Sequence, residues 1–267
     1  MSFYLDRPLN FAHRGASHEA PANTLAAFLL AVDLGAEGIE LDVHLSKDGH
    51  LVVIHDFDVS ATTDGQGLVR NKTLAELKEL DAGSWFDPVF ADQRIPTLQE
   101  VIDAVGHRLL LNIELKVKGW GDGGLAAKVV QIVEQSGLVD RVILSSFNPL
   151  TVWRAKRRNP QIATGLLYAQ DMPLFLRKAW LRRLVRPTAL HPHYTMVDAH
   201  YVWWANKQGY RVNVWTADDP ADMRRLMHAG VDIIITNRPD LLREVQQAGR
   251  AAVGEPKQRL SDALYPG

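Results

Sequence analysis

Residues 9–42 read LNFAHRGASHEAPANTLAAFLLAVDLGAEGIELD. Two short apolar runs with high strand propensity, 9–13 and 38–42, enclose an amphipathic helical stretch at 22–34. Strand, helix and strand in this order is typical of parallel strands joined by helical crossovers. The stretch therefore predicts the repeating unit of an α/β fold.

The same alternation continues to residue 247. Further strands are predicted at 109–114, 141–146, 162–168, 188–192, 211–215 and 232–236, and further helices at 97–106, 123–136, 149–158, 172–185, 198–208, 219–229 and 239–247. Eight strands that alternate with helices favour a (β/α)8 TIM barrel.

Two segments depart from a plain barrel. Residues 43–55 read as a β-hairpin that turns at Lys47-Asp48-Gly49 and brings His55 roughly opposite Asp42. Residues 56–96 form an insertion rich in turn residues, with one short helix near 73–80, and we expect it to be a small cap over the barrel mouth. The domain organisation is then one barrel domain over 1–250, with a polar tail at 251–267.

Composition narrows the class of protein. The chain has 267 residues, 46% of them hydrophobic, a formal net charge of -1 and no cysteine. Nothing in that charge favours bulk attraction to nucleic acid or an anionic membrane, and disulfides, thiolate catalysis and cysteine-bound zinc are excluded. The first residues do not resemble a signal peptide, and no apolar run approaches the roughly 20 residues that span a bilayer. We therefore expect a cytoplasmic protein.

Three acidic residues lie at the ends of predicted strands. Glu40 and Asp42 are one residue apart, so their side chains share a face of the strand, and Glu114 ends another strand. Buried carboxylates that share a rim require a counter-charge. An all-oxygen set of this kind predicts one divalent cation, Ca²⁺ or Mg²⁺, with Mn²⁺ also open. The alternatives are an exposed polar face for the first pair and an ion pair with Lys116 for Glu114.

Two histidines end strands at the same rim. His13 and His55 beside a cation provide what a hydrolase needs to take one proton and give another. Arg14 follows His13 directly, and its guanidinium can hold two phosphate oxygens at once. Trp215 ends a later strand, where it forms either a wall against an organic group or part of the core. The pattern indicates a metal-dependent hydrolytic site, which His44, His191 and His193 could also reach.

These motifs, in this order, resemble the glycerophosphodiester phosphodiesterase family. The resemblance runs through His13-Arg-Gly-Ala, Asn23-Thr-Leu-Ala-Ala-Phe, Gly35-Ala-Glu-Gly-Ile-Glu-Leu-Asp-Val, Lys47-Asp-Gly-His-Leu-Val-Val-Ile-His-Asp, Asn112-Ile-Glu-Leu-Lys, Ser145-Ser-Phe-Asn, Val214-Trp-Thr and Gly230-Val-Asp-Ile-Ile-Ile-Thr-Asn-Arg-Pro. It implies a TIM barrel with an insertion after the second histidine. It also implies metal-dependent hydrolysis of glycerophosphodiesters, such as glycerophosphocholine or glycerophosphoethanolamine, to sn-glycerol 3-phosphate and an alcohol.

The resemblance also assigns roles to the site residues. His13 and His55 become the acid and base pair, in an order that stays open, and Arg14 and Lys116 become phosphate contacts. Glu40, Asp42 and Glu114 become the ligands of the divalent ion. One position departs from the family pattern, because Ala22 stands where the family usually has glutamate.

Two other functions remain open. A lysophospholipase D-like enzyme would act on lysophospholipids, which the basic, partly apolar stretch 172–186 favours if it lies at a lipid surface rather than forming an ordinary barrel helix. A non-catalytic phosphodiester-binding module would fit the Ala22 departure. The expected partner is a small-molecule diester, with no nucleic acid and no membrane contact. Residues 56–96 could form a dimer contact as well as a lid, so a homo-oligomer is open.

Overall fold

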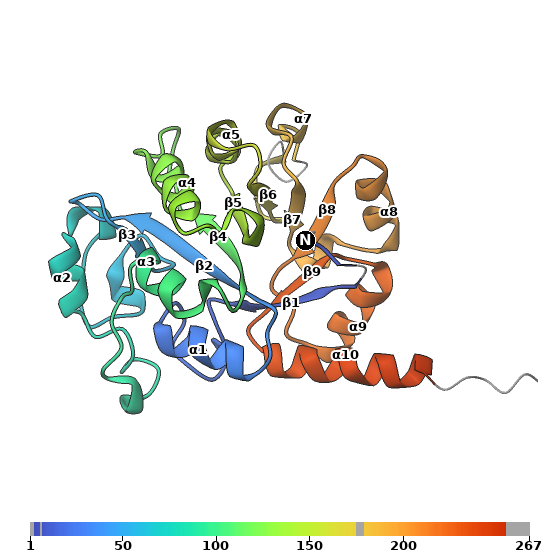
Figure 1. Ribbon diagram of the computed structural model, residues 1–267, viewed down its shortest axis with the longest axis horizontal. Helices are drawn as coiled ribbons and strands as arrows, with labels where there is room; N and C mark the ends of the chain where they lie inside the picture. Colours follow the sequence, from blue (N-terminus) through green and yellow to red (C-terminus); the bar gives the residue numbers. More distant parts are fainter. Residues whose placement is uncertain (1–2, 6, 175–178, 255–267) are drawn as a thin grey trace, which may run out of the picture.

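A closed barrel of parallel strands forms the centre of the computed structural model, which describes residues 3–5, 7–174 and 179–254 (Figure 1). Neighbouring strands follow the chain order, and β1 pairs with both β2 and β9, which closes the sheet. The strands are β1 (Leu9–His13), β2 (Gly38–Leu45), β4 (Leu110–Leu115), β5 (Val142–Ser146), β6 (Ala163–Tyr168), β7 (Ala189–Pro192), β8 (Arg211–Val214) and β9 (Ile233–Thr236). This confirms the predicted α/β TIM barrel.

Helices connect the strands and surround the barrel (Figure 1). They are α1 (Leu25–Asp33), α3 (Leu98–Val101), α4 (Leu125–Gln135), α5 (Pro149–Arg158), α7 (Arg182–Val185), α8 (Ala199–Lys207), α9 (Pro220–Ala229) and α10 (Pro239–Gly254). Their starts follow ordinary capping chemistry: Asp219, for example, accepts hydrogen bonds from the first turn of α9, and Pro220 follows it. Two short 3-10 helices, η5 (Val139–Arg141) and η6 (Tyr194–Met196), lie in the loops between strands and helices.

Three predicted helical or terminal segments differ from the structure. The helix at 97–106 starts at a Thr97–Glu100 capping box but finishes as a π-helical turn, η4 (Ile102–Gly106). The stretch 172–185 is not one helix, because Ala179 has a φ of 46°, a left-handed backbone that no α-helix accommodates. Residues 175–178 of that stretch lie outside the described residues. Helix α10 continues to Gly254, into the predicted tail, and 255–267 also lie outside them.

The predicted hairpin is present, with a register one residue from the expected one. Strand β3 (Leu51–Val53) pairs antiparallel to β2, with Val43 opposite Val53. Ile54 therefore lies opposite Asp42, and its amide donates to the Asp42 carbonyl over 3.0 Å. The cause lies in the turn, where the Ser46 amide bonds to the His50 carbonyl and so fixes the pairing. His55 leaves the ladder just beyond this pair.

Residues 56–96 form a small unit with its own apolar centre. It contains the helix α2 (Leu74–Glu79) and the 3-10 turns η1 (Val59–Ala61), η2 (Val69–Asn71) and η3 (Pro88–Phe90). In Figure 1 α2 lies beyond β3, to one side of the barrel. The buried residues of this unit and its neighbouring strand are Val52, Ile54, Val59, Val69, Leu77, Ala82 and Ile95.

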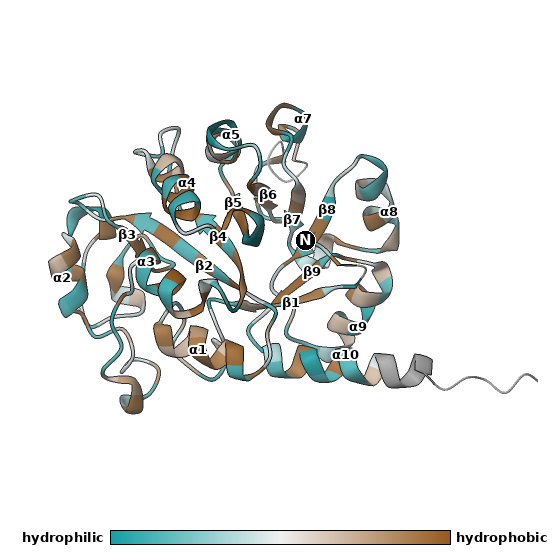
Figure 2. Cartoon of the chain, viewed as in Figure 1, coloured by the Kyte–Doolittle hydropathy of each residue, from teal (hydrophilic) through white to brown (hydrophobic). Residues whose placement is uncertain are grey.

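Strand alternation separates the apolar core from the polar interior. On β2, Ile39, Leu41 and Val43 pack in the layer between strands and helices, while Glu40 and Asp42 face the inside of the barrel. Figure 2 shows the matching mixture of hydrophobic and hydrophilic residues on helices such as α4. Nearer the amino ends of the strands the barrel interior is apolar, and Phe11 and Tyr4 belong to one buried cluster there. Polar groups are therefore concentrated toward the carboxyl ends of the strands.

No helix within the described ranges combines the length and the apolar character needed to traverse a lipid bilayer.

Candidate active site

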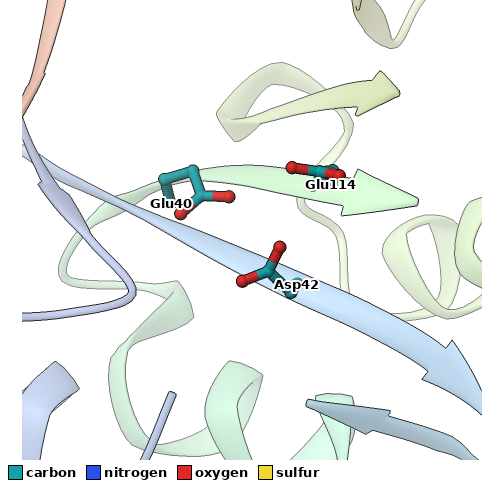
Figure 3. Close-up of side chains that lie close together, drawn as sticks. All are labelled: Glu40, Asp42 and Glu114. Atoms are coloured by element: carbon teal, nitrogen blue, oxygen red, sulfur yellow. The ribbon is translucent and has the colours of Figure 1, made fainter. Parts of the chain in front are cut away.

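The three predicted acidic residues converge inside the barrel mouth. Glu40 and Asp42 project from β2, and Glu114 projects from the neighbouring β4, directly opposite Asp42 in the register (Figure 3). One oxygen from each carboxylate lies within 4.8 Å of the others. All three side chains are buried, so each carboxylate loses most of its hydration.

Two cationic side chains partly balance this cluster. Lys116 Nζ lies 2.9 Å from Glu114 Oε1 and 3.2 Å from Asp42 Oδ1, and Arg14 Nε lies 3.4 Å from Asp42 Oδ2. The Glu114–Lys116 ion pair, which was the alternative to metal ligation, is thus present within the acidic cluster. Two cations still face three carboxylates.

The imbalance appears in the acid–base properties of the carboxylates. Burial, reinforced by the Asp42 and Glu114 charges, raises the pKa of Glu40 well above its usual range. Burial also raises the pKa of Glu114 to about 7, against the pull of Lys116. Burial opposes ionisation of Asp42 as well, but Lys116 and Arg14 outweigh it and hold its pKa well below the usual range. Only with all three carboxylates ionised does the cluster carry more negative charge than Lys116 and Arg14 neutralise, and the raised pKa values of Glu40 and Glu114 reflect the cost of that state.

This donor set fits a divalent cation. It consists of carboxylate oxygens only, which hard cations prefer. Asp42 Oδ1 is buried and accepts no hydrogen bond among the described residues, although Lys116 is close. A cation at this point would supply the missing positive charge and ligate that oxygen.

The loop after β1 is held tightly against the cluster. The Arg14 amide donates to the Glu40 carbonyl over 2.9 Å, with the Arg14 backbone in the left-handed region at φ 56°. Gly15 has φ 84°, and a Cβ there would lie 2.6 Å from the Ala27 backbone. Asn23 Nδ2 donates to Asp42 Oδ2 over 2.8 Å. Only glycine fits at position 15, because the loop packs directly against the backbone of α1.

His13 has a defined orientation. Asn237 Nδ2 donates to Asp218 Oδ2 over 2.6 Å, so the Asn237 amide oxygen is the atom turned toward His13. Asn237 Oδ1 lies 2.7 Å from His13 Nδ1 and can only accept, so Nδ1 carries the proton. The Nε2 atom of His13 then faces the acids, 3.8 Å from Glu40 Oε2. Burial and the Arg14 charge lower the pKa of His13 to about 4.

His55 has a different partner. Its Nδ1 lies 2.9 Å from Asp56 Oδ1, so the carboxylate accepts a hydrogen bond from the imidazole N–H, and the side chain is 34% exposed. Partial burial lowers the pKa of His55, against the attraction of Asp42. His44 Nε2 lies 3.1 Å from the His55 carbonyl, so this histidine supports the backbone of His55.

Trp215 lies at the opposite side of the mouth, in an aromatic group. Its ring makes edge contacts with Phe147 and His193, at centroid distances of 5.4 and 5.3 Å. Its Nε1 donates to the His191 carbonyl over 2.9 Å. His191 itself is fully buried in the barrel, so of the two alternatives for this residue, lining the pocket or packing in the core, the structure favours the core.

Asn23, Asp218 and Asn237 support the site, although the sequence assigned none of them a role there. Asn23 and Asn237 lie within motifs that carry the family resemblance, and Asp218 lies outside those motifs. Asn237 directly follows β9, and a polar residue after a barrel strand was the available signal. Asn23 has a φ of 60°, which places its amide inward.

Two hollows open beside the acidic cluster. A broad one of about 920 Å³ is lined by Arg14, Asn237 and Arg238, among others. A second, of about 330 Å³, lies between residues 56–96 and the loop after β4 and includes Lys116. Ala22, which stands where the family usually has glutamate, lines the first hollow.

Comparison with known proteins identifies close relatives. Residues 13–241 match the sequence model of the Glycerophosphoryl diester phosphodiesterase family. The chain is 42% identical to a glycerophosphodiester phosphodiesterase from Caldanaerobacter subterraneus subsp. tengcongensis, over 91% of this chain and 99% of that protein.

Solved structures agree with this similarity. A phosphodiesterase from Oleispira antarctica, solved in complex with its product sn-glycerol-3-phosphate, superimposes with a TM-score of 0.83 at 34% identity, over 92% of this chain and 100% of that one. A glycerophosphodiester phosphodiesterase from Thermotoga maritima gives a TM-score of 0.70 at 30% identity, over 89% and 98%.

Proposed function

Because this chain belongs to the glycerophosphoryl diester phosphodiesterase family and is a phosphoric diester hydrolase, we propose that the cluster at its barrel mouth releases sn-glycerol 3-phosphate from glycerophosphodiesters. The observation that carries the proposal is the convergence of three buried carboxylates with two differently oriented histidines. The product bound to the Oleispira relative supports the same choice of product.

His13 acts as the general base in this proposal. Its Nδ1 proton is engaged by Asn237, so Nε2 presents a lone pair toward the acidic cluster. That atom can take the proton of the attacking oxygen, which belongs either to water or to the neighbouring glycerol hydroxyl. The Asp218–Asn237 pair keeps the ring in this tautomer.

His55 acts as the general acid. The Asp56 carboxylate at its Nδ1 stabilises the imidazolium form, and Nε2 can then donate. As the new oxygen–phosphorus bond forms, the bond to the alcohol breaks, and the departing alkoxide takes this proton.

Arg14 and Lys116 are the proposed phosphate contacts. Both are already at the acidic cluster, and their charges oppose the negative charge that develops on the phosphoryl oxygens. Trp215 is proposed as the wall for the organic part of the substrate, because it follows β8 at the barrel mouth and its partly buried ring packs edge-on against Phe147.

Glu40, Asp42 and Glu114 would hold one divalent cation, and the all-oxygen set favours Ca²⁺ or Mg²⁺, with Mn²⁺ also acceptable. Such an ion supplies neutralising charge to a non-bridging phosphate oxygen and lowers the pKa of a bound hydroxyl.

We also propose that residues 56–96 cap the site in a single catalytic domain over 1–250. Asp56 begins this segment, and Phe57 and Arg70 from it line the hollow next to Lys116. A cytoplasmic location and a homo-oligomer remain predictions, which cell fractionation and sedimentation test.

Turnover of glycerophosphocholine and glycerophosphoinositol by chelator-stripped protein tests the function. Ca²⁺, Mg²⁺ and Mn²⁺ are added back separately, and glycerol 3-phosphate is measured with a coupled dehydrogenase. We expect one of the three ions to restore turnover, and calorimetry to detect binding of that ion to wild type but not to Glu40→Gln. Tight diester binding without turnover under every ion would contradict the proposal.

The same assay, run with lysophospholipid micelles as substrate, distinguishes the lysophospholipase D-like alternative from the proposed function. Strong stimulation on lysophospholipid micelles, with little turnover of water-soluble diesters, would replace glycerophosphodiesters as the substrate class.

A further inference from the structure

The hollow beside Lys116 is shaped by two segments that are far apart in the chain. Phe57, Leu68 and Arg70 line it from the 56–96 segment, and Lys118 and Asp122 line it from the loop after β4. Its volume of about 330 Å³ is in the range of small-ligand pockets. We call it the side pocket.

The side pocket adjoins the acidic cluster. Lys116 lines it and also lies 2.9 Å from Glu114 Oε1. His44 lines it as well, and the same ring bonds the carbonyl of His55 over 3.1 Å. A diester whose phosphate sits at the acidic cluster therefore has this pocket within reach of one of its two ester groups.

The charges of the side pocket are mainly positive. Arg70 and Lys118 supply two cations, and Asp122 supplies one carboxylate, which already accepts from the Gly124 amide over 3.1 Å. Lys116 also lines the pocket, but its charge is paired with Glu114 and Asp42. Within the described part of the chain neither Arg70 nor Lys118 forms an ion pair. The chain as a whole has a net charge of -1, so this local excess is not a general property of its surface.

The aromatic surface of the side pocket is already used by a cation. Lys118 Nζ lies 4.2 Å from the centre of the Phe57 ring, and the His44 ring meets Phe57 edge-on at 4.8 Å. A quaternary ammonium group is normally held by such a ring face. Here it would meet Lys118 instead, and the Arg70 guanidinium also lines the pocket.

We propose that the side pocket receives the alcohol part of the substrate and selects anionic or polyhydroxylated alcohols over cationic ones. This inference rests on the proposed function of the adjoining cluster. Arg70, Lys118 and Lys116 donate to phosphate, carboxylate or hydroxyl oxygens, and they repel a choline-type group.

Three diesters that differ in the charge of the alcohol test the selection: glycerophosphoinositol 4-phosphate, glycerophosphoinositol and glycerophosphocholine. We expect kcat/KM to fall in that order, by roughly tenfold or more from first to last. Lys118→Gln and Arg70→Gln should each reduce the ratio of the first to the last several-fold, mainly through KM. Arg158→Gln removes an exposed charge from α5, outside this pocket, and should leave the ratio unchanged.

Binding is measured together with turnover, by calorimetry of the same three diesters on the His13→Ala variant. Failure to hydrolyse any diester would count against the proposed function, while the ratio of the Kd values would still decide the selection. The inference would be overturned if glycerophosphocholine bound as tightly as the anionic diester or more tightly. It would also be overturned if Lys118→Gln and Arg70→Gln left the ratio of kcat/KM between these two diesters at the wild-type value.

Discussion

Two layers of buried polar side chains lie inside the barrel, and they differ in charge. The charged layer at the mouth contains Glu40, Asp42, Glu114 and Lys116. The neutral layer contains Asn112, Ser145, His191 and Asn213, of which Asn112 is the register neighbour of Glu40 and Ser145 that of Glu114. Both layers come from inward-facing strand positions, so burial alone does not distinguish them.

The neutral layer behaves as a polar core. Asn213 Nδ2 lies 2.8 Å from His191 Nε2 and 3.2 Å from the Tyr4 hydroxyl, and burial lowers the pKa of His191 to about 3, so the ring stays neutral. The charged layer holds more carboxylates than cations. Buried charge without full compensation destabilises a fold, so the charge of the first layer agrees with its proposed catalytic role, whereas we expect the neutral layer to serve stability.

The largest effect on activity is expected when one of the two histidines beside the charged layer is removed. We expect His13→Ala and His55→Ala each to lower kcat by roughly 10²- to 10⁴-fold on an alkyl diester, with an unchanged circular dichroism spectrum. A p-nitrophenyl leaving group needs no general acid, so it should restore turnover largely in His55→Ala but not in His13→Ala. Rescue of both variants, or of His13→Ala alone, would contradict the assigned roles.

Neutralising one carboxylate separates activity from stability. Glu114→Gln keeps the shape and removes part of the excess charge, so we expect turnover to fall roughly 10²-fold or more while the unfolding free energy without metal stays equal or rises by about 1 kcal/mol. Urea denaturation in chelator measures the second quantity. A loss of several kcal/mol would instead make Glu114 a structural residue that Lys116 depends on.

The neutral layer should show the reverse. Asn213→Ala deprives His191 and the Tyr4 hydroxyl of their partner, which should cost about 2–3 kcal/mol of unfolding free energy and change kcat by less than about threefold. Asn206→Ala, on the exposed face of α8, is the control and should cost less than about 0.5 kcal/mol. A large loss of kcat in a folded Asn213→Ala variant would show that the neutral layer also contributes to turnover.

The last test concerns pH and His191. Its folded pKa of about 3 lies below the ordinary value of 6.5, so the unfolded chain binds a proton first as pH falls. The stability due to the neutral ring is complete above about pH 6.5 and is lost progressively toward pH 3, by up to about 1.4 kcal/mol per pH unit. Comparing wild type with His191→Gln by denaturation at several pH values isolates this slope. Parallel curves would show that His191 is not held neutral.

Much of the barrel could be predicted from the sequence, because strand and helix periodicity are local. The run 38–42 alternates apolar and acidic residues, and this alone places Glu40 and Asp42 on one face. His13, Glu114 and Lys116 followed from the rule that the strands of a barrel end at one rim. The hairpin register required more, because the Ser46–His50 bond shifts the pairing by one residue.

Only the tertiary structure decided which side chains are partners across the barrel. Asn237 orients His13 from a position 224 residues away, and no local pattern encodes that contact. Gly165 leaves the space that the His191 ring fills, since a Cβ there would lie 2.3 Å from Nε2, and this decided that His191 belongs to the core. The sequence determined the elements and the chemistry at their ends, because periodicity and residue type are carried by neighbouring residues. The tautomer of His13, the charge balance of the acids and the side pocket depend on packing between distant segments.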